Sequence, residues 1–250
     1  MTITITEILW GIDAILALVC GVRIYQSYRK TLDKTVGNYA KFFIFFGLGF
    51  IGATIADPLI PGEFNIKLMI TLSLLVLFIG LAYLARMATA LAYPRFEKYA
   101  FLSVIAANIL TVIANVKYYL LAPTRAPFLD PKTGVFVVNF PVIVTILVVI
   151  TVLATMFIPG IIFIRKARRI EDKAVRTRGM LLGSGLILFA VGFMACGAGR
   201  AVLPMQISHL FIASAYLPFL VTTFYIIKKK VPEAIPSVKA VPAAAPKIPW

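Results

Sequence analysis

Long apolar runs separated by short polar connections dominate the chain. A helix of about 20 apolar residues, rising ~1.5 Å per residue, crosses the ~30 Å hydrocarbon core of a bilayer. The pattern therefore predicts an all-α, polytopic membrane protein with seven transmembrane helices. Their predicted bounds are Ile5–Tyr25, Ala40–Ile60, Ile66–Tyr93, Ala100–Leu121, Phe140–Ile164, Gly179–Leu203 and Met205–Ile227.

Basic residues fall almost entirely on every second connection between these runs. They cluster after the first, third, fifth and seventh spans, as in Arg29–Lys30, Arg95–Lys98, Arg165–Arg178 and Lys228–Lys230. Lys and Arg that flank membrane spans are retained on the cytoplasmic side. We therefore expect the N-terminus to lie outside and the C-terminus in the cytoplasm of a multi-pass protein of the cytoplasmic membrane.

Composition changes how the charge is interpreted. Hydrophobic residues make up 61% of the chain and charged residues only 14%, which excludes an ordinary soluble globule. The net charge of +15 is then mostly a topology signal, and we expect no nucleic-acid partner. The bilayer is the expected partner, with anionic lipids attracted to the inner face at about 1 kcal/mol per basic residue.

The chain divides into a transmembrane domain, residues 1–230, and a Pro- and Ala-rich segment, residues 231–250, that we expect to be an extended cytoplasmic tail. The connection 122–139 is the only long one on the predicted outer side. Its Asp130–Gly134 turn sequence lies between β-prone residues, which predicts either a small hairpin lid or an irregular loop. The acidic residues Glu7 and Asp13 argue against a cleavable signal, so we expect the first span to be retained.

Polar side chains within the spans gather towards the predicted outer side. Ionisable groups in a membrane are costly and are candidates for function. Asp13 lies about 10 Å deep and needs a partner at a similar depth. One interpretation is an outward-opening ligand pocket; the other is a set of interfacial residues and interhelical hydrogen bonds. The candidate pocket residues are Asp13, Asn108, Asn115, Lys117, Arg200, His209 and Tyr216.

Glycines and arginines mark two further features of the sixth span and the connection before it. Small residues let membrane helices approach closely, so we expect a packing role within the bundle, with a homodimer seam as the alternative. The packing candidates are Gly179, Gly183, Gly185, Gly192 and Gly199.

The basic connection lacks Pro and Gly, and we expect it to extend the fifth span as a helix. It either only sets topology or docks an acidic cytoplasmic or membrane protein, with the tail as a second contact. The candidate docking residues are Arg165, Arg168, Arg169, Arg176 and Arg178.

Residue counts argue against several kinds of catalytic site. The last span contains no Lys for a retinal Schiff base, and one histidine, His209, is too few for bis-His haem or His-rich zinc sites. Ser184 and His209 cannot form a serine protease site, because their predicted depths in the membrane differ by roughly 10 Å or more. We expect no catalytic residues, no metal and no cofactor.

The seven spans, the hairpin-like outer loop and the Arg-rich Ile164–Arg178 leading into the Gly-rich Met180–Gly199 resemble the seven-helix sensor regions of prokaryotic histidine kinases. They are more distantly similar to rhodopsin-like receptors. The chain has no kinase domain, no Asp-Arg-Tyr motif within Ala92–Phe96, and no Asn-Pro-x-x-Tyr motif at Pro218. The resemblance is one of architecture, and no functional residue is carried over.

We therefore expect a non-catalytic membrane protein, first of all a receptor or sensor module. It would recognise a small or apolar ligand from outside and signal through residues 165–178 and the tail. The alternative is an accessory or structural subunit of a larger membrane complex. A small transporter is a third hypothesis, for which Asp13 and Asn108 give only a sparse polar path.

Overall fold

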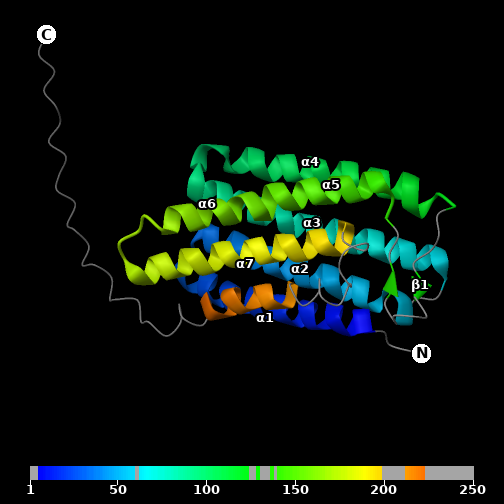
Figure 1. Cartoon of the computed structure of the whole chain (residues 1–250), viewed down its shortest axis with the longest axis horizontal. Helices are drawn as coiled ribbons and strands as arrows, with labels where there is room; N and C mark the ends of the chain where they lie inside the picture. Colours follow the sequence, from blue (N-terminus) through cyan, green and yellow to red (C-terminus); the bar gives the residue numbers. More distant parts are fainter. Residues whose placement is uncertain are drawn as a thin grey trace, which may run out of the picture.

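The computed structural model describes residues 5–59, 62–123, 128–129, 136–137, 140–198 and 212–222. These residues form a bundle in which successive spans run in opposite directions (Figure 1). The long helices are α1 (Ile5–Thr31), α2 (Lys34–Leu59), α3 (Glu63–Ala92), α4 (Glu97–Asn115), α5 (Val142–Val152), α6 (Ile158–Ala167) and α7 (Lys173–Ala198). The short elements are the 3₁₀ turn η1 (Pro94–Phe96), the π-helical turns η2 (Val116–Leu120) and η3 (Leu153–Phe157), and the strands β1 (Phe128–Leu129) and β2 (Phe136–Val137). A further helix, Ile212–Thr222, is called here the last helix.

Six of these helical segments are long and apolar enough to cross a membrane. They are Thr6–Thr31, Lys34–Ile55, Glu63–Leu91, Pro94–Leu120, Val142–Ala167 and Val175–Ala195. The predicted all-helical membrane architecture is confirmed at this level. The predicted seventh span, Met205–Ile227, lies partly outside the described residues, and the last helix within it is apolar but shorter than a span. The tail 231–250 lies outside the described residues altogether.

The distribution of exposed and buried side chains is typical of a protein surrounded by lipid. Large apolar side chains face outwards along α1 and α4, including Ile15 on α1 and Leu110 on α4. Acidic and amide side chains such as Asp13 and Asn115 are buried instead. A broad apolar surface is costly in water and favourable in hydrocarbon, where polar side chains are buried instead. This arrangement supports a membrane location independently of helix length.

A small hairpin closes one end of the bundle. β1 pairs antiparallel with β2, with Phe128 opposite Val137 and Leu129 opposite Phe136. The hairpin prediction for the connection 122–139 is confirmed over the irregular loop. β2 also contacts α1, so the connection between α4 and α5 reaches the first helix. We call this the hairpin end; the opposite end, with the connections α1–α2, α3–α4 and α6–α7, is the basic end (Figure 1).

Glycines let α6 and α7 cross at close range. A Cβ atom added to Gly160 would lie 2.8 Å from the carbonyl oxygen of Gly183, and one added to Gly183 would lie 2.7 Å from that of Gly160. Gly179 faces Ala167 and Gly185 faces the Phe219 ring. These predicted packing glycines therefore lie at contacts within the chain. Gly192 is buried, and Gly199 lies outside the described residues.

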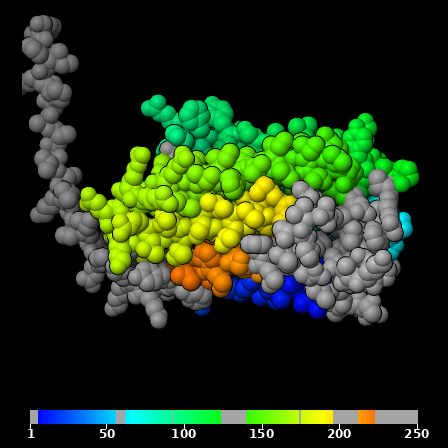
Figure 2. Space-filling view, viewed as in Figure 1, coloured from blue at the N-terminus to red at the C-terminus, as the bar shows by residue number. Residues whose placement is uncertain are grey.

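An aromatic core joins the last helix to α2 and α7. The rings of Phe189 and Tyr216 have centroids 4.7 Å apart, and those of Phe43 and Phe219 are 5.1 Å apart. All four side chains are fully buried. Figure 2 shows the surface of α7 between that of α5 and α6 on one side and that of the last helix on the other.

The expectation of one continuous helix over residues 165–178 is wrong. α6 ends at Ala167, and the amide groups of Arg169 and Ile170 donate to carbonyl groups three residues back, which tightens the chain into a turn. Asp172 then accepts a hydrogen bond from the amide of Val175 at 3.1 Å, as an N-cap residue does, and α7 begins at Lys173. The N-cap at Asp172 starts a new helix here, although residues 165–178 contain no Pro or Gly to interrupt the first one.

Candidate functional site

Among the buried polar side chains of the described helices, two groups contain predicted pocket residues. One group lies on α1, with members on α2 and the last helix, and the other lies between α3 and α4. Helix contacts follow the order α1–α2, α2–α3 and α3–α4, so the two groups lie on opposite sides of the α2–α3 contact.

The first group, called here the Asp13 site, consists of Asp13, Cys20, Tyr39 and Tyr216. Asp13 and Cys20 are seven residues apart on α1 and therefore share a face. Asp13 is 1% exposed, and Cys20 and Tyr216 are fully buried. Tyr39 lies on α2, with its ring centroid 6.2 Å from that of Phe219 on the last helix. The site thus collects an acid, a thiol and two phenols from α1, α2 and the last helix.

Two phenol oxygens of this site are unsatisfied. Within the described part of the chain, the buried hydroxyl groups of Tyr39 and Tyr216 have no hydrogen-bond partner. Leaving a buried polar group without a partner costs about 1–3 kcal/mol. Such groups are rare in native proteins and call for a bound water, ion or ligand. The site therefore has unused hydrogen-bonding capacity at Tyr39 and Tyr216.

The second group, called here the asparagine seam, joins α3 to α4 by hydrogen bonds. The Asn108 amide nitrogen donates to the Leu75 carbonyl oxygen at 3.2 Å. The Asn115 amide nitrogen donates to the Thr71 hydroxyl at 3.3 Å, and that hydroxyl donates to the Lys67 carbonyl oxygen at 2.7 Å. These contacts match the interhelical hydrogen-bond interpretation of the two asparagines.

A buried lysine extends the seam towards the hairpin end. Lys67 is only 6% exposed, and its Nζ lies 5.5 Å from the centroid of the fully buried Tyr119 ring. A desolvated cation–π contact is worth about 2 kcal/mol. Tyr119 belongs to the π-helical turn η2, in which its neighbours Lys117 and Tyr118 remain exposed. Irregular turns of this kind are frequent at functional sites.

The predicted pocket residues are therefore divided. Asp13 and Tyr216 lie in the Asp13 site, while Asn108 and Asn115 lie in the asparagine seam. Lys117 joins neither group: it is exposed, with its Nζ 5.1 Å from the Tyr118 ring centroid. Arg200 and His209 lie outside the described residues.

Sequence reasoning missed several members of both groups. Cys20 and Tyr39 were not candidates for the Asp13 site, nor were Lys67, Thr71 and Tyr119 for the seam. A signal for the seam is present, since Lys67 and Thr71 are four residues apart, as are Asn115 and Tyr119, and each pair occupies one helix face.

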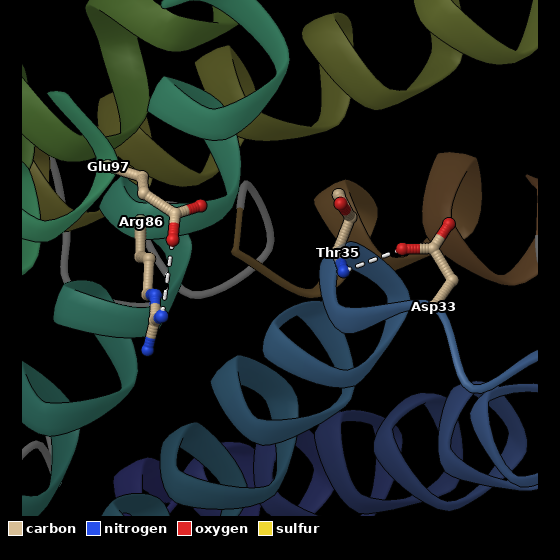
Figure 3. A network of polar contacts seen from close by, with 4 residues as sticks. All are labelled: Asp33, Thr35, Arg86 and Glu97. Atoms are coloured by element: carbon tan, nitrogen blue, oxygen red, sulfur yellow. Dashed lines mark hydrogen bonds and ion pairs between the residues drawn. The ribbon is translucent and has the colours of Figure 1, made fainter. Parts of the chain in front are cut away.

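The basic end carries charged side chains near the α3–α4 connection. Arg86 on α3 forms an ion pair with Glu97 at the start of α4, with Nη2 and Oε1 3.3 Å apart (Figure 3). The same guanidinium lies 5.9 Å from the Phe101 ring centroid. Asp33 caps α2 nearby, accepting a 2.8 Å hydrogen bond from the amide of Thr35 (Figure 3). These contacts fix the starts of two helices.

The candidate docking arginines lie at the same end. Four of them are exposed and one, Arg178, is partly buried. The exposed residues are Arg165, Arg168, Arg169 and Arg176. They extend across the α6–α7 turn, so they form part of the surface of the basic end.

Comparison of the chain with known protein families and with curated proteins finds no match to either. The function is therefore inferred from the chemistry of the two buried polar groups and of the basic end.

Proposed function

We propose that the chain is a non-catalytic membrane sensor module whose ligand-responsive element is the Asp13 site. In this proposal the N-terminus and the hairpin end face the outside, and the basic end faces the cytoplasm. The last helix completes a seventh span. A ligand that reaches the Asp13 site shifts α1 against the last helix, and the change is passed along these helices to the turn between α6 and α7.

The carrying observation is the burial, within the bundle, of an acid and of a phenol whose hydroxyl is unsatisfied. Asp13 lies about 12 Å along α1 from its first residue, at 1.5 Å per residue. A charged group at such depth is costly and is retained where it has a task. The Tyr216 hydroxyl, which is also buried, has no hydrogen-bond partner in the described structure. A small polar ligand that donates a hydrogen bond to Asp13 and accepts one from the Tyr216 hydroxyl would engage both groups.

The charge distribution supports the orientation. Among the described residues, the connections at the basic end carry Arg29, Lys30, Arg95, Arg168 and Arg169, whereas the hairpin end has Lys67 and Lys117. Lys and Arg near span ends favour the cytoplasmic side.

Native mass spectrometry of the full chain, purified in a mild detergent, tests the proposal. We expect wild type to retain a non-lipid small molecule. Asp13→Asn should lower its occupancy at least tenfold, because a hydrogen bond to a charged group is worth about 1.5–3 kcal/mol. Tyr216→Phe, which removes only the hydroxyl, should weaken retention less. Ser103→Ala on the exposed face of α4 is the matched control and should retain the molecule fully.

An accessory-subunit function is the second candidate, favoured by the exposed arginines of the basic end. It predicts that the full chain co-purifies with a stoichiometric protein and that truncation after Lys230 releases it. That result, together with no retained small molecule, would replace the sensor proposal.

A further inference from the structure

A cleft of about 150 Å³ lies between α3 and the fifth span, near the basic end. We call it the α3–α6 cleft. The last turns of α3 form one wall, and η3 with α6 forms the other. Its walls are mainly apolar, and they include Ala88, Thr89, Tyr93, Ala154, Pro159 and Phe163.

The sequence explains why a hollow exists here. Pro159 has no amide hydrogen to donate to the preceding turn, and the π-helical turn η3 directly precedes it. A π-helical turn carries an extra residue and displaces the backbone from a regular helical path. Ala88 and Ala154, which face this region from opposite walls, are too small to fill the space.

The rim of the cleft at the basic end is cationic. Lys166 is exposed, and its Nζ lies 3.5 Å from the Leu91 carbonyl oxygen and 5.8 Å from the centroid of the Tyr93 ring. Tyr93 itself is 61% exposed. Lysines near the end of a span place their ammonium group at the level of lipid headgroups, and tyrosines favour the same level.

We propose that the α3–α6 cleft binds one anionic phospholipid of the leaflet at the basic end. The first part of an acyl chain lies in the cleft, and the phosphate contacts the Lys166 ammonium. The volume matches an apolar cavity of about 150 Å³, which accommodates a benzene-sized group. Arg165, Arg168 and Arg169 are exposed beside Lys166, so the local charge favours an anionic over a zwitterionic headgroup.

The cleft also lies where a lipid can enter it. Ile158 on its wall is 52% exposed on a span whose outer surface faces hydrocarbon. This inference does not depend on the Asp13 site or on the sensor proposal. Failure of the small-molecule experiment leaves it intact.

Native mass spectrometry of the full chain with added phosphatidylglycerol or phosphatidylcholine, of identical acyl chains, tests the headgroup. We expect wild type to retain one phosphatidylglycerol with about fivefold preference, from roughly 1 kcal/mol per basic residue at the surface. Lys166→Ala should abolish that preference. Lys98→Ala is the matched control, because Lys98 is an exposed lysine near the same end, on α4 and not among the residues that line the cleft.

A second pair of variants tests the cleft. Ala154→Phe places a ring in it and should reduce retention of both lipids several-fold. Ala106→Phe makes the same change on the exposed face of α4 and should leave retention unchanged. Because both alanines are exposed, neither substitution disturbs the core. Glycerol phosphate, which has the anion but no acyl chain, should not be retained.

Four results would overturn the proposal. These are equal retention of the two lipids by wild type, an equal loss in Lys98→Ala and Lys166→Ala, full retention by Ala154→Phe, and retention of glycerol phosphate as strong as that of phosphatidylglycerol. A lipid-free dimer in the same spectra would assign the cleft to a second copy of the chain instead.

Discussion

The contacts α6–α7 and α3–α4 hold neighbouring helices together in opposite ways. Between α6 and α7, Gly160 and Gly183 bring two backbones so close that neither position has room for a Cβ atom. Between α3 and α4, Asn108 and Asn115 span the gap with side-chain hydrogen bonds. In hydrocarbon, helices associate by close packing and by interhelical hydrogen bonds rather than by the hydrophobic effect. Close packing holds α6 to α7, and hydrogen bonds hold α3 to α4. Different substitutions should therefore weaken the two contacts.

The largest effect should come from closing the space between α6 and α7. A Cβ atom on Gly183 would lie 2.7 Å from the Gly160 carbonyl oxygen and 3.1 Å from the backbone nitrogen of Ile164, neither of which can rotate away. We expect Gly183→Ala to lower the free energy of unfolding by about 1–3 kcal/mol, as overpacking does. Reversible unfolding in mixed detergent micelles measures this change.

Gly11→Ala is the matched control for that substitution. Its Cβ atom would meet only the Thr54 methyl group at 3.8 Å, an ordinary contact. Alanine is favoured over glycine inside a helix by roughly 0.5–1 kcal/mol, so this variant should be as stable as wild type or slightly more stable. Equal destabilisation of both variants would contradict the close-approach explanation.

A smaller effect should come from the asparagine seam. In a double-mutant cycle of Thr71→Val and Asn115→Ala, we expect a coupling free energy of about 0.6 kcal/mol and at most about 1.7 kcal/mol, the range found for interhelical hydrogen bonds. Pairing Thr71→Val with Ser103→Ala should give no coupling, since Ser103 is exposed on another face of α4. Coupling of the same size in both cycles would mean that the hydrogen bond is not its source.

The smallest effect should come from the ion pair at the other end of the α3–α4 contact. Arg86 and Glu97 each have side chains that are 32% exposed, so water and salt screen their attraction. We expect Glu97→Gln to change the free energy of unfolding by less than about 1 kcal/mol, and by less still at high salt. A large, salt-independent loss would place this pair among the main supports of the contact.

The hydrophobic pattern predicted most of the fold because each span must be long and apolar whatever its neighbours are. It also offered the hairpin as one of two alternatives, from turn residues between β-prone residues. The break after Ala167 was missed because an N-cap such as Asp172 is a single residue within a run that otherwise favours a helix. The π-helical turns η2 and η3 were not predicted either, because they depend on how the fourth and fifth spans pack.

The candidate site was predicted only in part for a related reason. Depth along a helix can be counted from the sequence, and it correctly marked Asp13, Asn108 and Asn115 as polar groups within spans. Which helix each one faces depends on the order in which helices pack. That order puts Asn115 against Thr71, and Tyr216 against Phe189, contacts that no spacing in the chain specifies.

The position of the last helix has a consequence for biosynthesis. Tyr216 and Phe219 pack against rings of α2 and α7, yet they belong to the last helix, which the ribosome makes after the six described spans. A nascent chain that stops before Ile212 lacks both rings, so Phe43 of α2 and Phe189 of α7 lose the aromatic partners they pack against. Burying a Phe side chain contributes about 1.5–3 kcal/mol. The contact of α2 and α7 with the last helix can therefore form only after six spans have been synthesised.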